Sequence, residues 1–144
     1  MISLDYTNGQ AASAGAKGFL TSADWSTFNG KQAALGYTPL NELITTNRQT
    51  SNYQLVSGDQ NKLVEMNLAG ANNLTVPANA TVAFPIGAQV MVSQYGAGKT
   101  TIVAAGGVTL YSDSGLLSIG AQYAAVALIK INTNEWYVFG SLQA

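Results

Sequence analysis

The chain has 144 residues, of which 47% are hydrophobic, enough for one domain with a buried core and an appendage. Cysteine and histidine are absent, which excludes disulfides, thiolate metal sites and the commonest general base. Only 9% of the residues are charged, so the surface suits burial in an oligomer or a larger particle. The net charge is −1 and no basic patch is present, so binding of nucleic acid is not expected.

The N-terminal segment, residues 1–20, is rich in Gly, Ala and Ser and shows no sustained hydrophobic period. Disorder or an extended conformation is one interpretation, and ordering by a partner is the other. A basic segment followed by an apolar one, which would indicate a secretory signal, is missing. We expect residues 1–20 to form an extended or anchoring segment.

One helix is expected over residues 21–35. Thr21 is a suitable N-cap, and Asp24 follows three residues later in a variant of the capping box. Gly36 can end the helix in the left-handed conformation, and Pro39 prevents it from continuing.

The helix is expected to carry an apolar seam. Trp25, Phe28, Gln32 and Leu35 follow one another at spacings of three, four and three residues, as in a short coiled coil. About four turns of helix are marginally stable alone. The seam therefore has to pack, either on the β region of the same chain or on other copies around a threefold axis. The helix and the irregular linker expected at 38–52 make up a second segment, residues 21–52.

Residues 53–144 form the expected β domain. Runs of β-branched and aromatic residues alternate with Gly and Asn turns. The expected strands are Tyr53–Ser57, Lys62–Leu68, Asn73–Val76, Ala88–Tyr95, Thr100–Ala105, Val108–Tyr111, Tyr123–Asn132 and Glu135–Leu142. Short strands at close spacing predict a mainly β fold, an antiparallel sandwich or barrel-like head after the short N-terminal helix.

The last two expected strands have different faces. In Glu135–Leu142, Trp136 and Val138 share one face with Leu142, and Tyr137 and Phe139 take the other. Tyr123–Asn132 is apolar on both faces except at Lys130, which predicts a covering layer on each side, one of them supplied by a neighbouring subunit. The apolar run Ser114–Ile129 is too short for a membrane-spanning helix, so no membrane insertion is expected.

Gly96–Thr101, GAGKTT, superficially resembles a phosphate-binding loop. The required first glycine is missing because residue 93 is Ser, and a strand follows in place of a helix. We interpret it as a hairpin turn with a solvated Lys99. No cofactor is expected.

Three carboxylates remain as candidates for hydrolysis of polysaccharide: Glu65, Asp113 and Glu135. Asp59 falls in a turn and is expected to be solvated. The nearest thing to a calcium loop, Ser112–Gly115, has one carboxylate, so no metal site is expected. We expect no catalytic residues.

Several aromatic residues lie near turns: Tyr95, Tyr111, Tyr123, Trp136 and Tyr137. Such side chains either stack on sugar rings or fill the core or a subunit interface. Tyr95 and Tyr111 are the candidates for surface binding.

Two segments resemble bacteriophage fibre proteins. Gly18–Asn41 is similar to the element LTSADWSTFN, followed by KQ and ALGYTP, of tail-fibre and head-fibre proteins. Tyr53–Leu142 is similar to a C-terminal fibre module at KLVEM (Lys62–Met66), Thr75–Pro77, Phe84–Gly87, Gln94, Gly96, Gly98, Gly107–Thr109 and Trp136. The resemblance implies a homotrimer with a slender N-terminal part and a globular β head, located on the virion.

The resulting expectation is a non-enzymatic virion structural protein, a short trimeric head fibre or tail fibre. Residues 1–20 would attach to capsid or tail proteins, the helix would trimerise, and the head would bind host or environmental glycans. Two alternatives stay open, a capsid decoration protein without a receptor role and a polysaccharide-degrading fibre tip. Since the long repetitive shaft of tail fibres is missing, the chain is either a complete small fibre or an excised tip.

Overall fold

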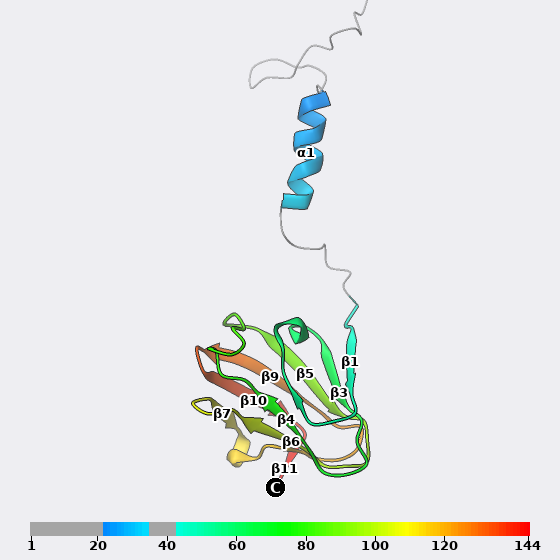
Figure 1. Ribbon diagram of the computed structural model, residues 1–144, viewed down its shortest axis with the longest axis vertical. Helices are drawn as coiled ribbons and strands as arrows, with labels where there is room; N and C mark the ends of the chain where they lie inside the picture. Colours follow the sequence, from blue (N-terminus) through cyan, green and yellow to red (C-terminus); the bar gives the residue numbers. More distant parts are fainter. Residues whose placement is uncertain (1–21, 35–42) are drawn as a thin grey trace, which may run out of the picture. The chain divides into compact units, whose positions relative to one another are not determined.

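The computed structural model describes residues 22–34 and 43–144, which belong to two separate compact units (Figure 1). The first unit contains helix α1, Ser22–Ala34, within the range expected for a helix. Thr27 donates a hydrogen bond from Oγ1 to the carbonyl of Ala23 (2.9 Å). Phe28, on the expected seam, is 63% exposed. The expected caps Thr21, Gly36 and Pro39, the whole of Leu35, and the side chains of Trp25 and Gln32 lie outside the described part of the chain.

The second unit is a β domain made of two sheets that face each other across one core (Figure 1). The six-stranded sheet has the order β1-β3-β5-β9-β10-β7, and the five-stranded sheet has the order β11-β8-β6-β4-β2. The strands are β1 Thr46–Gln49, β2 Tyr53–Gln54, β3 Leu63–Met66, β4 Asn72–Val76, β5 Gln89–Gln94, β6 Thr100–Ala104, β7 Thr109–Ser112, β8 Ser118–Ile119, β9 Ala125–Asn132, β10 Glu135–Gly140 and β11 Leu142–Gln143. Single 3-10 turns occur at η1, Ser57–Asp59, and η2, Asp113–Gly115.

The expectation of a mainly β, two-layered domain is confirmed, but the expectation of purely antiparallel sheets is wrong. From β1 to β6 the chain alternates between the two sheets, and each strand pairs in parallel with the strand two positions later. The first six strands therefore form three stacked coils, as in a parallel β-helix. The segments β8 to β11 close the sheets with antiparallel pairs.

The glycine turns explain why a prediction of hairpins failed. Gly96-Ala97-Gly98 does not join neighbouring strands; it carries the chain from β5 in one sheet to β6 in the other. The amides of Gly96 and Gly98 donate to the carbonyls of Met66 and Leu68 (both 2.9 Å), in the turn of the preceding coil. A side chain has no room here, because a Cβ on Gly98 would lie 1.9 Å from the carbonyl oxygen of Gly70. The GAGKTT segment is thus a stacked coil turn.

Buried polar side chains support the same stack. Thr100 donates from Oγ1 to Asn72 Oδ1 (2.9 Å) and from its amide to Gln94 Oε1 (3.1 Å). Asn72 Nδ2 donates to the carbonyl of Gly70 (3.1 Å). Since Asn72, Gln94 and Thr100 are all buried, these bonds replace the water that the polar groups lose on folding.

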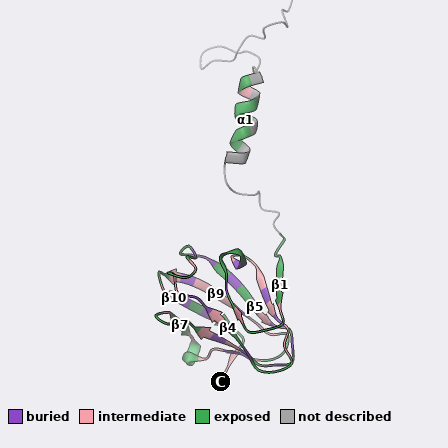
Figure 2. Cartoon of the chain, in the orientation of Figure 1, coloured by how far each residue is buried: buried purple, intermediate pink, exposed green. Residues whose placement is uncertain are grey.

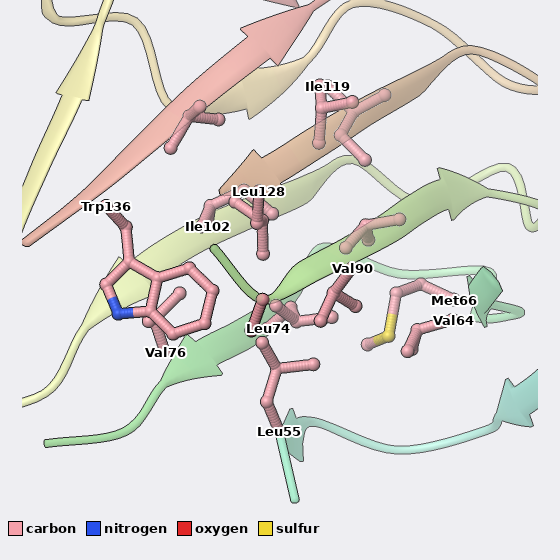
Figure 3. Packing of buried hydrophobic residues seen from close by; sticks show 14 of the residues in the cluster. Leu55, Val64, Met66, Leu74, Val76, Val90, Ile102, Ile119, Leu128 and Trp136 are labelled. Atoms are coloured by element: carbon pink, nitrogen blue, oxygen red, sulfur yellow. The ribbon is translucent and has the colours of Figure 1, made fainter. Parts of the chain in front are cut away.

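The core lies between the sheets and follows the period of two that a strand imposes (Figure 2, Figure 3). Trp136 and Val138 of β10 point into it, as expected, while Tyr137 and Phe139 are exposed. Phe84 meets Trp136 edge to face, with ring centroids 5.4 Å apart. Other buried apolar residues are Leu55, Val64, Met66, Leu74, Val76, Ala88, Val90, Val92, Ile102, Ile119, Val126 and Leu128.

Lys130 of β9 points inward and is only 2% exposed. Its Nζ donates to Asn79 Oδ1 (2.5 Å) and to the carbonyl of Phe84 (2.7 Å). Burial lowers the pKa of this ammonium, because desolvation disfavours its charged form. Lys130 therefore attaches the loop between β4 and β5 to the core edge.

Asp59 corrects a second expectation, since it is buried and not solvated. Its carboxylate accepts hydrogen bonds from the Tyr53 hydroxyl (2.9 Å), Asn47 Nδ2 (2.7 Å) and the Val56 amide (2.9 Å). Asn47 lies on β1, a strand within the segment that was expected to be an irregular linker. The carboxylate thus joins strands of both sheets in the first coil.

Candidate functional site

The two outer faces of the β domain differ in chemistry. The five-stranded sheet presents mostly polar side chains: Gln54, Asn73, Thr75, Thr101, Val103 and Gln143. The outer face of the six-stranded sheet carries polar residues as well, among them Arg48, Glu65, Gln89, Ser93, Thr109 and Glu135. Its apolar residues, here together called the apolar face, are Leu63, Met91, Tyr111, Ala125, Ala127, Ile129, Ile131, Tyr137 and Phe139. A sheet that is covered on one side normally has an apolar inner face and a polar, solvated outer face. The apolar face is therefore the surface that suggests a binding role.

An exposed aromatic cluster stands at one end of the apolar face. Tyr111 on β7 is paired with Tyr137 on β10, and Phe139 follows on the same face of β10 two residues later. The ring centroids of Tyr111 and Tyr137 are 5.8 Å apart, and those of Tyr137 and Phe139 are 5.3 Å apart. The three side chains are 42–48% exposed. The parallel pairing of β7 with β10 therefore brings together residues that are far apart in sequence.

This cluster borders an open cavity of about 240 Å³. The residues that line it are Tyr111, Ser112, Asp113, Tyr137, Val138 and Phe139. Asp113 is exposed in the 3-10 turn η2, where Ser114 donates a hydrogen bond to its carboxylate (3.3 Å). Aromatic surface beside a single carboxylate is a combination that can bind a ligand with one apolar face and several hydroxyls.

Tyr95, the other candidate for surface binding, lies elsewhere. It follows β5, and its ring meets that of Tyr123 edge to face at 6.0 Å. The guanidinium of Arg48 stands 3.8 Å from the centroid of Tyr95 and 3.0 Å from the carboxylate of Glu65. The hydrogen bond to Glu65 raises the pKa of Arg48. Tyr95 and Tyr111 thus belong to two separate clusters, and the Tyr95 face is already occupied by Arg48.

The three carboxylates proposed for polysaccharide cleavage are not brought together. Through the strand pairing, Glu65 aligns with Ala125 of β9, whereas Glu135 aligns with Asn132, seven residues or roughly 23 Å further along. Glu135 pairs with Thr109 of β7, and Ser112, the residue before Asp113, lies roughly 10 Å further along the same strand. Glycosidase pairs stand about 5–9.5 Å apart.

Among the described residues, no group of three or more Asp and Glu side chains could hold a metal ion. Within the same ranges, no helix is long and apolar enough to cross a membrane.

Comparison with known protein families, curated proteins and solved structures finds no match.

Sequence reasoning identified part of the aromatic cluster. Tyr111 was a candidate, and the alternation of β10 placed Tyr137 and Phe139 on the face opposite Trp136, which proves to be in the core. The pairing of β7 with β10 had no local signal, because parallel neighbours are distant in sequence. Asp113 was considered as a catalytic carboxylate and as the single carboxylate of a calcium-loop candidate, and its position beside the rings was missed.

Proposed function

We propose that the chain is a non-enzymatic structural protein of a bacteriophage virion, a short trimeric fibre whose β head attaches to glycans of the host or its surroundings. Residues 1–20 attach to capsid or tail proteins, and α1 contributes to trimerisation. The proposal rests on the resemblance of Gly18–Asn41 and Tyr53–Leu142 to phage fibre proteins and on the scarcity of charge.

The observation that carries the attachment role is the exposed aromatic cluster beside its cavity. A shallow, open site of this size gives weak binding to one sugar. Three copies on one fibre, and several fibres on one particle, convert weak contacts into firm attachment because later contacts form at high effective concentration.

The spacing of Glu65, Asp113 and Glu135 supports attachment without cleavage. A glycosidase needs an acid and a second carboxylate on opposite sides of one scissile bond. With these groups spread over the sheet, the head is suited to hold a polysaccharide.

The test has two measurements. Imaging of virions labelled with an antibody against the chain should locate it at the particle surface, and the purified full chain should sediment with cells or with capsular polysaccharide of a susceptible host. Binding without release of reducing ends supports the proposal. A capsid location without glycan binding would favour a decoration protein, release of reducing ends would favour a degrading fibre tip, and absence from the particle would overturn the proposal.

A further inference from the structure

We propose that the cavity beside Tyr111, Tyr137 and Phe139 is a subsite for a single neutral or amino-bearing pyranose ring, and that it rejects sugars carrying a carboxylate. This inference rests on the proposed function and specifies which sugars the head recognises. Two features of the cavity support it: its shape and its charge.

The shape fits one sugar ring. The cavity measures about 240 Å³, below the roughly 300–1,000 Å³ of pockets that enclose drug-sized ligands. Neighbouring rings in the cluster are tilted by 54° and 33°, so they form a curved surface and not a flat platform. Such a surface can cover the C–H face of a pyranose while the sugar hydroxyls remain at the rim.

The charge selects the class of sugar. Asp113 is the ionisable acid in the lining, and none of the six lining residues is basic. Its carboxylate can accept hydrogen bonds from sugar hydroxyls or from an ammonium group, and bonds to charged acceptors are stronger than neutral ones. A uronic or sialic acid would instead bring a second negative charge beside Asp113 without a cation to neutralise it.

A packed protein surface is a poorer occupant of the same cavity. It would have to cover the exposed Asp113, and the lining offers no cation to pair with the carboxylate. Burying an unpaired charge is costly, and charged residues are depleted from the centres of protein interfaces. A hydroxyl-rich ligand removes less water from the carboxylate and replaces it with hydrogen bonds.

In the experiment, the full chain is titrated with three soluble trisaccharides of similar size: a neutral glucose trimer, a glucosamine trimer and a glucuronic acid trimer. Binding is measured from shifts of the amide signals of the protein in NMR spectra. Tyr111→Ala and Tyr137→Ala should each weaken binding of the neutral trimer roughly tenfold. Tyr123→Ala is the matched control, because it removes an exposed tyrosine from the other cluster and should leave affinity unchanged. Asp113→Asn should weaken the glucosamine trimer and strengthen the glucuronic acid trimer, each several-fold.

The outcomes separate this inference from the proposed function. If the wild-type chain sediments with host polysaccharide but Tyr111→Ala and Tyr137→Ala bind all three trimers as well as the wild type, the subsite is wrong while glycan attachment stands. Preference for the glucuronic acid trimer by the wild type would overturn the assignment of sugar class. If the tyrosine variants change the mass of the assembly and not sugar binding, the cluster is a subunit contact and the inference fails. Loss of folding would be visible in the amide spectrum, and Tyr111→Phe would then replace Tyr111→Ala. Because this variant keeps the aromatic ring, it should retain binding.

Discussion

Gly96 and Gly98 stand where one coil turn lies directly on the turn before it. Virtual Cβ atoms at these positions meet backbone atoms of Leu68 and Gly70, at 2.2 Å and 1.9 Å from the carbonyl oxygens. Backbone of a packed turn cannot move aside as a flexible side chain can. At these two positions glycine is required by space and not by dihedral angle.

Gly98→Ala should therefore destabilise the head by about 3 kcal/mol, at the upper end of the range for overpacking. Urea unfolding at constant pH measures the change in the free energy of unfolding. Gly106→Ala is the matched control, because its Cβ would meet nothing within 4 Å, and it should change stability by no more than about 0.5 kcal/mol. Equal effects of the two substitutions would contradict the stacked-turn account.

At the scale of elements, the first coil depends on the network around Asp59. Tyr53 on β2 and Asn47 on β1 both donate to this buried carboxylate, so one side chain connects strands of the two sheets. Burial raises the pKa of the Tyr53 hydroxyl, and its hydrogen bond to Asp59 adds to the effect. The protonated tyrosine is the form that holds the coil together.

The sign of the pH effect follows from this shift. In the unfolded chain Tyr53 loses its proton near pH 10, while the folded chain retains it to higher pH, so stability should fall as the pH rises above about 10. Tyr53→Phe removes the hydrogen bond to Asp59 and should lower the free energy of unfolding by about 1 kcal/mol at neutral pH. The difference in unfolding free energy between wild type and variant should become smaller between pH 10 and pH 11. Lys130 has a lowered pKa, so its own contribution makes stability rise as the pH approaches 10.5, the ordinary pKa of a lysine. Because both proteins contain Lys130, this contribution cancels in the difference between them. A gap that stays constant from pH 7 to pH 11 would refute the role given to Tyr53.

The elements also show how far sequence alone reaches. The inner and outer faces of β10 were predicted correctly because alternation is a local property that Trp136 and Val138 display directly. The parallel pairing of β3 with β5 was missed, since no residue in either strand reports which sheet the intervening strand joins. Strand β1 was missed because Thr46–Gln49 is polar and carries no apolar alternation, and its place is fixed by pairing with β3 and by the contact of Asn47 with Asp59.

At the scale of the whole molecule, one chain leaves apolar surface uncovered in both described units. In α1, Phe28 is largely exposed, and in the β domain Met91 of the apolar face is 41% exposed. Strand β9 was expected to be covered on both sides. Its inner face is buried by the core, whereas Ala127 and Ile129 on its outer face remain partly exposed in the isolated chain. Copies of the chain packed together would supply the missing cover.

We therefore expect three chains in solution at micromolar concentration, measured by sedimentation equilibrium. Phe28→Ala removes apolar surface from the proposed helix contact and should raise the concentration at which the trimer dissociates by at least roughly tenfold, because burial of a phenylalanine contributes about 1.5–3 kcal/mol. Lys31→Ala is the matched control on the same helix, since Lys31 is also exposed but lies off the expected seam, and it should leave the mass unchanged. A wild-type chain that sediments as a clean monomer would refute the trimer proposal. If the trimer is unaffected by Phe28→Ala, the contact lies on the apolar face and not on the helix, and Ala127→Glu should then separate the chains.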